Sequence, residues 1–160
     1  TEDLAPTSGK ESKIRLRVNL DGTFAVEAAP LTQRALPQPA RVGLARAPVD
    51  SSMIWLYHKT TRREIYDAAR ASRPDCDEVI LWNERGELTE ASMANVVLDL
   101  DGAWVTPPVT SGLLAGTFRR WLLAAGQIRA RILTPADLHA AQRIALINSV
   151  RKWRAAILVS

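Results

Sequence analysis

The sequence predicts an α+β domain in which strands outnumber helices. Most apolar residues fall in short runs bounded by Gly, Pro, Asn or Asp, which is typical of strands. Two longer segments, 61–72 and 117–125, have the residue spacing of amphipathic helices. A chain of 160 residues is long enough to form one domain with its own core.

The first part of the chain predicts a hairpin between two segments without regular structure. Residues 1–12 are polar and aperiodic, so we expect them to be disordered. Apolar and polar residues alternate over 13–20, which indicates a half-buried strand. Asp21-Gly22 predicts a turn and 23–28 the returning strand, before a Pro-rich linker at 29–40.

The rest of the chain predicts strands interrupted by helices. The apolar run Met53–Tyr57 indicates a short strand before the polar segment that begins at His58. Pro74 ends the first helix and Gly126 the second, while Thr134-Pro135 predicts the N-cap and first residue of a third. Further strands are expected at 41–46, 78–82, 96–100, 103–106, 128–133, 143–148 and 154–159.

Composition excludes several classes of protein. Cys76 is the only cysteine, so no internal disulfide forms, and His58 and His139 lack the spacing of metal ligands, so we expect no metal site. The net charge of +4 is spread among interspersed acidic residues, so we expect no nucleic-acid partner. No apolar run approaches the roughly 20 residues of a membrane helix, and the N-terminus does not resemble a signal peptide, which makes a cytoplasmic protein our expectation.

Four polar segments could carry chemistry, although each is a weak signal by itself. The first is Lys59, which follows the apolar run. A lysine shielded by apolar neighbours can act as an amine nucleophile, but a solvated lysine beside a strand is commoner. The choice of lysines is small, because the chain contains only Lys10, Lys13, Lys59 and Lys152.

The other three segments lie further along the chain. Gly112–Arg119 is a glycine-containing loop that enters a helix, where free N–H groups bind phosphate well, although an ordinary loop is the commoner case. Glu87–Asn95 places two carboxylates and an amide between strands, a pairing also found in glycosidases, but nothing else indicates a sugar site. Asn148-Ser149-Val150 ends an apolar strand with groups that can donate to an anion.

Taken together, the order and spacing of these segments resemble the class IV pyridoxal-phosphate enzymes, which include branched-chain and D-amino-acid aminotransferases and aminodeoxychorismate lyase. The resemblance is carried by Glu90-Ala-Ser92-Met-Ala-Asn95-Val96, Thr106, Leu114-Ala-Gly116-Thr-Phe-Arg119 and the lysine segment Tyr57–Arg63. The closest likeness is to the lyase-like half of fused para-aminobenzoate synthases, which share the stretches His58–Arg63, Asn83–Glu90 and Ile147–Arg151.

The resemblance implies pyridoxal 5′-phosphate as cofactor and a role for each matching residue. Lys59 would be the catalytic residue, which binds the cofactor covalently and then moves protons. Glu90 would face the pyridine nitrogen, and Asn95 would support the site. The remaining cofactor-binding residues, at the phosphate, would be Gly116, Thr117, Phe118, Ser149 and Val150.

The resemblance also implies a fold and a domain organisation. The fold would be the large C-terminal domain of the D-amino-acid aminotransferase type, a strand-rich pseudo-barrel with flanking helices. Residues 13–45 would be the remnant of a small N-terminal domain with its linker, and 46–160 the cofactor-binding large domain. Val97 departs from the family signature, which has an aromatic residue there, and so do Trp104 and Thr117, where it has aliphatic ones.

The implied activity is that of a lyase of folate biosynthesis, which converts 4-amino-4-deoxychorismate to 4-aminobenzoate and pyruvate. Two alternatives stay open: a class IV aminotransferase acting on branched-chain or D-amino acids, and a catalytically incomplete fragment that lacks the small domain. The expected partners are a small-molecule substrate, either aminodeoxychorismate or an amino acid, and a second copy of the chain in a homodimer. A synthase domain in the same parent chain is also compatible with the resemblance.

Overall fold

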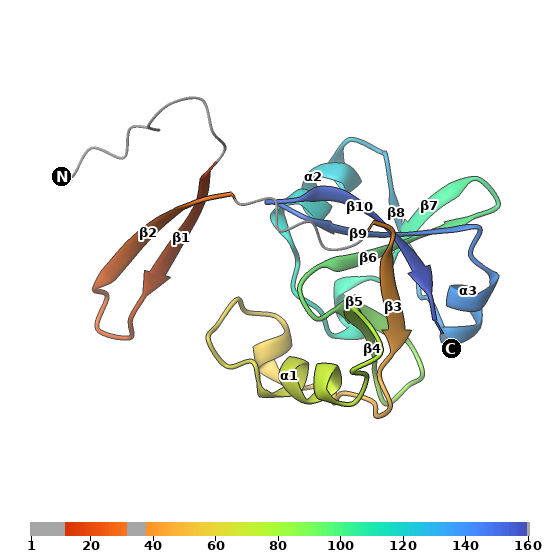
Figure 1. Ribbon diagram of the computed structural model, residues 1–160, viewed down its shortest axis with the longest axis horizontal. Helices are drawn as coiled ribbons and strands as arrows, with labels where there is room; N and C mark the ends of the chain where they lie inside the picture. Colours follow the sequence, from red (N-terminus) through yellow and green to blue (C-terminus); the bar gives the residue numbers. More distant parts are fainter. Residues whose placement is uncertain (1–11, 32–37, 160) are drawn as a thin grey trace. The chain divides into compact units, whose positions relative to one another are not determined.

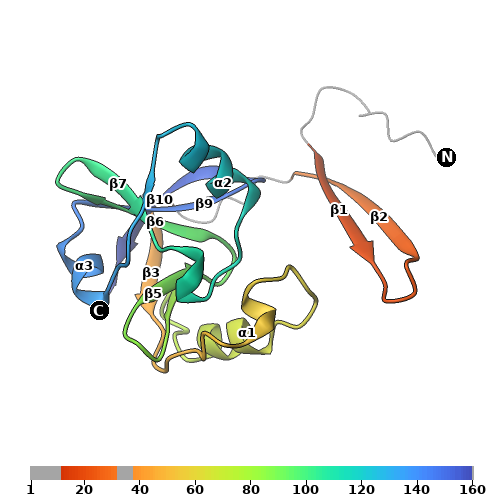
Figure 2. The same ribbon diagram turned by 180° about the vertical axis from the view of Figure 1, so that it is seen from behind.

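The computed structural model describes residues 12–31 and 38–159, which fall in two compact units divided after Ala35 (Figures 1 and 2). The disordered start expected at 1–12 lies almost wholly outside the described residues, as does most of the expected linker.

The first unit is the expected hairpin. Strand β1 (Ser12–Val18) pairs antiparallel with β2 (Phe24–Pro30), and Gly22 in the connecting turn has a φ of 82°, which a residue without a Cβ adopts freely. The expected burial of one face was wrong, since Ile14 and Leu16 are 60% and 61% exposed. A hairpin of two strands has no second layer within its unit to cover an apolar face.

The second unit contains eight strands, three α-helices and two 3₁₀ helices among its described residues. In chain order they are β3 (Ala40–Leu44), η1 (Ile54–Leu56), α1 (Glu64–Ala71), β4 (Glu78–Trp82), β5 (Leu88–Ala91), β6 (Asn95–Leu100), β7 (Ala103–Thr106), η2 (Val109–Ser111), α2 (Thr117–Ala124), β8 (Arg129–Ala130), α3 (Pro135–Ala140), β9 (Arg143–Asn148) and β10 (Lys152–Leu158).

The strands form one curled sheet in the order β5-β4-β3-β10-β9-β6-β7-β8. β3 lies parallel to both of its neighbours, β4 and β10, whereas β9 is antiparallel to β10 and β6. The edge strand β5 runs directly into β6 through a tight turn bridged by Ala91 and Ala94, so the sheet curves back toward its own middle (Figure 1). This strand-rich curled sheet with few helices confirms the expected α+β class.

Burial on both faces explains why the central strands are almost continuously apolar. In β6, Val96 and Leu98 belong to the largest core cluster, which also takes in Leu138 of α3, whereas Val97 packs on the opposite face with Leu122 of α2. β4 has the same two-sided character, and α1 and η1 cover its second face. The sheet therefore carries α1 and α2 on the face away from the largest core cluster, where they help to form the site described below.

Several element boundaries differ from expectation. The run 53–57 is not a strand but contains η1, because the chain turns at Asp50 and bonds Met53 N to the Asp50 carbonyl at 3.1 Å. Helix α1 starts at Glu64 rather than 61, since the Thr60 hydroxyl accepts from the Arg62 N–H and holds that segment in a turn. β8 is only two residues long and pairs with the single neighbour β7.

The third helix begins as the sequence predicts. The Thr134 side chain accepts from the Asp137 N–H at 3.3 Å, and the Asp137 carboxylate accepts from the Thr134 N–H at 2.8 Å, which forms a reciprocal capping box. Pro135 occupies the first helical position. Among residues 12–31 and 38–159, no helix is both long and apolar enough to cross a membrane.

The capping box gives a first testable prediction. Thr134→Ala should lower the free energy of unfolding by about 1 kcal/mol, because it removes the side-chain acceptor of an N-terminal helical N–H. Thr134→Ser, which keeps the hydroxyl, is the matched control and should stay near the wild type. Urea denaturation followed by circular dichroism measures both, and equal stability of the two variants would show that the box contributes nothing.

Candidate active site

Glu90 is a buried carboxylate near the end of β5, with only 5% of its surface exposed. Its Oε1 accepts from the Tyr66 hydroxyl at 2.8 Å and from the Leu114 N–H at 3.1 Å. Among the described residues, its Oε2 accepts only a longer bond of 3.3 Å, from Asn95 Nδ2. One oxygen is therefore held by the protein, whereas the other keeps the capacity to bind a further donor.

Burial determines the electrostatics of this carboxyl. Desolvation raises the pKa of Glu90 to about 7, and the hydrogen bonds from Tyr66 and Leu114 offset only part of that rise, together with the charges of Lys59 and Arg63. Burial and the neighbouring carboxylate raise the pKa of Tyr66 as well, so its hydroxyl stays a donor. A cationic group placed beside Oε2 would favour ionised Glu90 near neutral pH.

Asn95 and Gly116 lie behind Glu90 and fix the segment that approaches it. Asn95 Nδ2 donates to the Leu114 carbonyl at 2.9 Å as well as to Glu90. A Cβ at Gly116 would lie 2.3 Å from Asn95 Oδ1, so no larger residue fits at that position without a rearrangement. The Gly116 N–H already donates to the Leu114 carbonyl at 2.8 Å, which leaves the next amides of the chain for any ligand.

Lys59 lies in the exposed loop between η1 and α1. It borders a small cavity of about 30 Å³. The cavity is lined by Trp55, His58, Lys59, Thr60, Arg62, Arg63, Tyr66 and Leu114. Tyr66 and Leu114 both line this cavity and donate to Glu90. Lys59 and the Glu90 carboxylate are therefore linked through the same two residues.

Two arginines add positive charge to the cavity of Lys59. The Arg62 guanidinium lies over the Trp55 ring, 4.4 Å from its centroid. The Arg63 guanidinium lies 4.8 Å from the Tyr66 ring centroid and donates to the Ser92 carbonyl at 2.6 Å. Contacts with aromatic faces and a carbonyl orient both cations without neutralising them, so the cavity attracts anionic groups.

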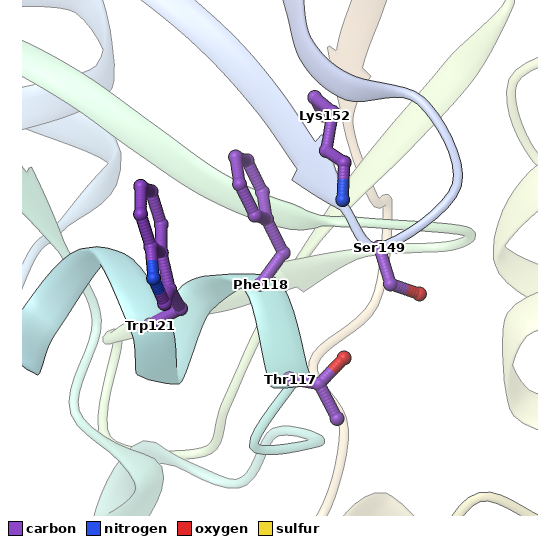
Figure 3. A pocket seen from close by; sticks show the side chains of 5 residues that line it. All are labelled: Thr117, Phe118, Trp121, Ser149 and Lys152. Atoms are coloured by element: carbon purple, nitrogen blue, oxygen red, sulfur yellow. The ribbon is translucent and has the colours of Figure 1, made fainter.

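A larger pocket of about 380 Å³ lies at the start of α2 (Figure 3). It is lined by Thr117, Phe118, Trp121, Ser149 and Lys152. The first N–H groups of a helix have no acceptor within it, and the Gly116 N-cap supplies none from a side chain. Three of the expected phosphate ligands, Thr117, Phe118 and Ser149, thus meet in this pocket.

Val150 is placed differently from the other expected ligands. It is 38% exposed and does not line the pocket of Thr117 and Ser149. Its N–H donates to Asn148 Oδ1 at 3.1 Å, and so does the Arg151 N–H at 2.7 Å. The Asn148 side chain therefore shapes the turn between β9 and β10, in which Ser149 lies.

The short segment 114–117 joins the two pockets. Leu114 borders the Lys59 cavity and Thr117 borders the larger pocket, and three residue steps span at most about 11 Å. A ligand with an aldehyde on a ring and an anionic arm could place the aldehyde at the Lys59 cavity and the anionic arm in the larger pocket. Within the described part of the chain, no group of His, Cys, Asp and Glu side chains is arranged to hold a metal ion.

Sequence reasoning missed three residues of this neighbourhood. Tyr66 lies on the predicted first helix, but nothing in the helical pattern indicates that its hydroxyl donates to Glu90. Arg63 was noted only as part of the lysine segment. Lys152 directly follows the Ile147–Arg151 stretch and is one of only four lysines, a scarcity that could have drawn attention to it.

Comparison with known proteins identifies relatives of the whole domain. A model of the amino-transferase class IV family matches residues 3–157. A Schizosaccharomyces pombe protein named "Putative aminodeoxychorismate lyase" is 35% identical over 109 residues, which cover 64% of this chain and 47% of that protein. The chain thus spans about half the length of this curated relative.

Solved structures share the fold. A Mesorhizobium loti protein titled "Putative amino-acid aminotransferase" is 36% identical, with a TM-score of 0.86 over 92% of this chain and 73% of that chain. A Legionella pneumophila protein titled "Putative 4-amino-4-deoxychorismate lyase" is 20% identical, with a TM-score of 0.77 over 84% of this chain and 52% of that chain. At that identity the second similarity concerns the fold alone.

The buried carboxyl predicts a specific pH dependence of stability. Folding raises the Glu90 pKa from about 4.5 to about 7, so the stabilisation is complete below the unfolded pKa and is lost as the pH rises through the folded one. As the pH rises from the unfolded pKa to the folded pKa of Glu90, the unfolding free energy of the wild type should fall by about 3 kcal/mol relative to that of Glu90→Gln. Urea unfolding across this range measures the difference, and a constant gap between the two proteins would contradict the shifted pKa.

The contact between Gly116 and Asn95 makes a second prediction for this site. Gly116→Ala should cost about 2 kcal/mol, because the new Cβ forces Asn95 away from Leu114 and Glu90. In an Asn95→Ala background the same substitution should cost much less, since the clashing amide is absent. A double-mutant cycle by thermal or urea unfolding measures the coupling, and additive costs would exclude this contact as the cause.

Proposed function

The chain belongs to the amino-transferase class IV family, and we propose that it provides the catalytic residues of a lyase that converts 4-amino-4-deoxychorismate to 4-aminobenzoate and pyruvate. The observation that carries the proposal is that Lys59 lines a cavity together with two arginines and lies near enough to buried Glu90 for its charge to lower the pKa of that carboxyl. The relative from Schizosaccharomyces pombe, which is named as such a lyase, supports the same choice.

Proteins of this family use pyridoxal 5′-phosphate, and the residues present suit that group. Glu90 Oε2 is buried, accepts one long hydrogen bond and keeps the capacity to accept another, which would suit the protonated nitrogen of a pyridine ring. The N–H groups of Thr117 and Phe118, with the Ser149 hydroxyl, would hold the phosphate at the helix start. Lys59 would supply the amine that binds the aldehyde.

When bound, the cofactor supplies an electron-withdrawing ring that makes removal of a proton next to the substrate amine feasible. Lys59 Nζ would take that proton, because it is the amine at the cavity and no histidine other than exposed His58 lines it. Glu90, held on Oε1 by Tyr66 and Leu114, would keep its negative charge beside the ring.

The substrate chemistry suits a cationic cavity. Aminodeoxychorismate carries two carboxylates, and Arg62 and Arg63 both present guanidinium groups beside Lys59. In the reaction the substrate carbon that bears the amine loses its proton, and the bond between the substrate ring and the enolpyruvyl oxygen breaks. The substrate ring thereby becomes aromatic. The released enol takes up a proton to become pyruvate, so the atoms balance without water or a second substrate.

An aminotransferase is the second candidate, favoured by the likeness to the Mesorhizobium loti protein at 36% identity. Lys59 and Glu90 would serve it equally well, because transamination begins with the same proton removal. It differs in needing an oxo acid as amino acceptor. The proposal further includes a homodimer that acts in the cytoplasm in folate biosynthesis, with residues 13–45 as the remnant of a small N-terminal domain and its linker and 46–160 as the cofactor-binding large domain.

Covalent labelling tests the cofactor-binding part of the proposal. The purified chain is mixed with pyridoxal 5′-phosphate, reduced with borohydride, digested and analysed by mass spectrometry. The phosphopyridoxyl adduct should lie on Lys59 and should be lost in Lys59→Ala. Lys13→Ala, which removes a lysine in β1, is the matched control and should label as the wild type does.

Labelling spread over all lysines, or none on a folded chain, would contradict cofactor binding and favour an incomplete fragment. The reaction is then tested with chorismate, glutamine and a synthase partner. Release of pyruvate together with 4-aminobenzoate supports the lyase, whereas amino transfer to an oxo acid without 4-aminobenzoate would replace it by the aminotransferase.

A further inference from the structure

Lys152 is the cation of the larger pocket. It lies at the start of β10 and lines the pocket together with Thr117, Phe118, Trp121 and Ser149. Figure 3 shows its ammonium group directed from β10 into the space above the start of α2, where the Thr117 hydroxyl points as well. The ammonium lies 4.9 Å from the centroid of the Phe118 ring.

The surroundings of Lys152 are positively polarised, and the described residues supply no counter-charge. The first turn of α2 contains no acidic residue, so the positive end of the helix dipole is not neutralised there. Within residues 12–31 and 38–159, no carboxylate forms an ion pair with Lys152. Lys152 itself is exposed, and an anion placed between its ammonium group and the start of α2 would be attracted by both.

The backbone of Lys152 is also unusual. Its φ is 56°, which lies in the left-handed region that glycine adopts without strain and other residues rarely occupy. A lysine at such a position costs backbone energy that a glycine would avoid. Residues held in such conformations gather at functional sites, where the side chain has a use.

From these three observations we propose that Lys152 binds the phosphate of the cofactor, as a cation that acts with the start of α2 and the Ser149 hydroxyl. The inference rests on the proposed function, since the phosphate in question is that of pyridoxal 5′-phosphate. It assigns the positive charge of the phosphate site to the second unit itself. The Phe118 ring holds the ammonium group in place through its face.

The test compares the affinities of pyridoxal 5′-phosphate and of pyridoxal, which lacks the phosphate, by isothermal titration calorimetry. Lys152→Gly removes the ammonium group and suits the left-handed backbone, so the variant should be at least as stable to heat as the wild type. It should bind pyridoxal 5′-phosphate about ten-fold more weakly and pyridoxal equally well, because only the charged hydrogen bond to phosphate is lost.

Two further variants separate charge from packing. Lys152→Arg keeps the positive charge and should retain most of the affinity, whereas Lys152→Met keeps the aliphatic stem over Phe118 and should behave as Lys152→Gly does. Lys13→Met is the matched control at a lysine of the first unit. Inorganic phosphate should compete with pyridoxal 5′-phosphate for the wild type more strongly than for Lys152→Gly.

The two proposals fail in different ways. One outcome is that the wild type binds both compounds through Lys59 while the ratio of its affinities for pyridoxal 5′-phosphate and pyridoxal is unchanged in Lys152→Gly. In that case Lys152 is not a phosphate ligand, and the proposed function stands. If Lys152→Met weakens both compounds equally, Lys152 acts through packing and the inference is wrong. If the wild type binds neither compound, the proposed function fails and the assignment of Lys152 falls with it.

Discussion

The buried carboxyl of Glu90 is the constraint on which the rest of the site depends. A carboxylate that is 95% removed from solvent is costly unless donors surround it. Tyr66 of α1, Leu114 of the loop before α2 and Asn95 of β6 supply those donors. Meeting the hydrogen-bonding needs of one side chain thus draws three separate elements together and fixes the loop that leads into the larger pocket.

The curled sheet makes this convergence possible. Because β5 turns directly into β6, Glu90 and Asn95 lie only five residues apart, on two strands that are consecutive in the chain. Both faces of the central strands are buried, so α1 and α2 pack against the face away from the largest core cluster and bring Tyr66 and the start of α2 to the same side. The segment 114–117 then links the cavity of Lys59 to the pocket of Ser149 and Lys152.

Much of this arrangement could be predicted from sequence, because strand and helix patterns depend on local periodicity. The strands β4, β7 and β9 and the Thr134 cap lie where the pattern indicates them. The run 53–57 was misjudged, since its turn depends on Asp50 hydrogen bonds and on the burial of Leu56 alone. Tyr66 and Lys152 could not be assigned, because their partners, Glu90 and Phe118, are distant in sequence.

Titration of Glu90 itself is the most direct test of its role in the site. Its carboxyl carbon can be followed by ¹³C NMR across the pH range, with Glu90→Gln identifying the signal. Without ligand the pKa should be about 7. With pyridoxal 5′-phosphate bound it should fall well below that value, because a protonated ring nitrogen beside Oε2 favours the carboxylate. An ordinary pKa in the free chain, or one that does not change with the cofactor, would contradict the central role of this residue.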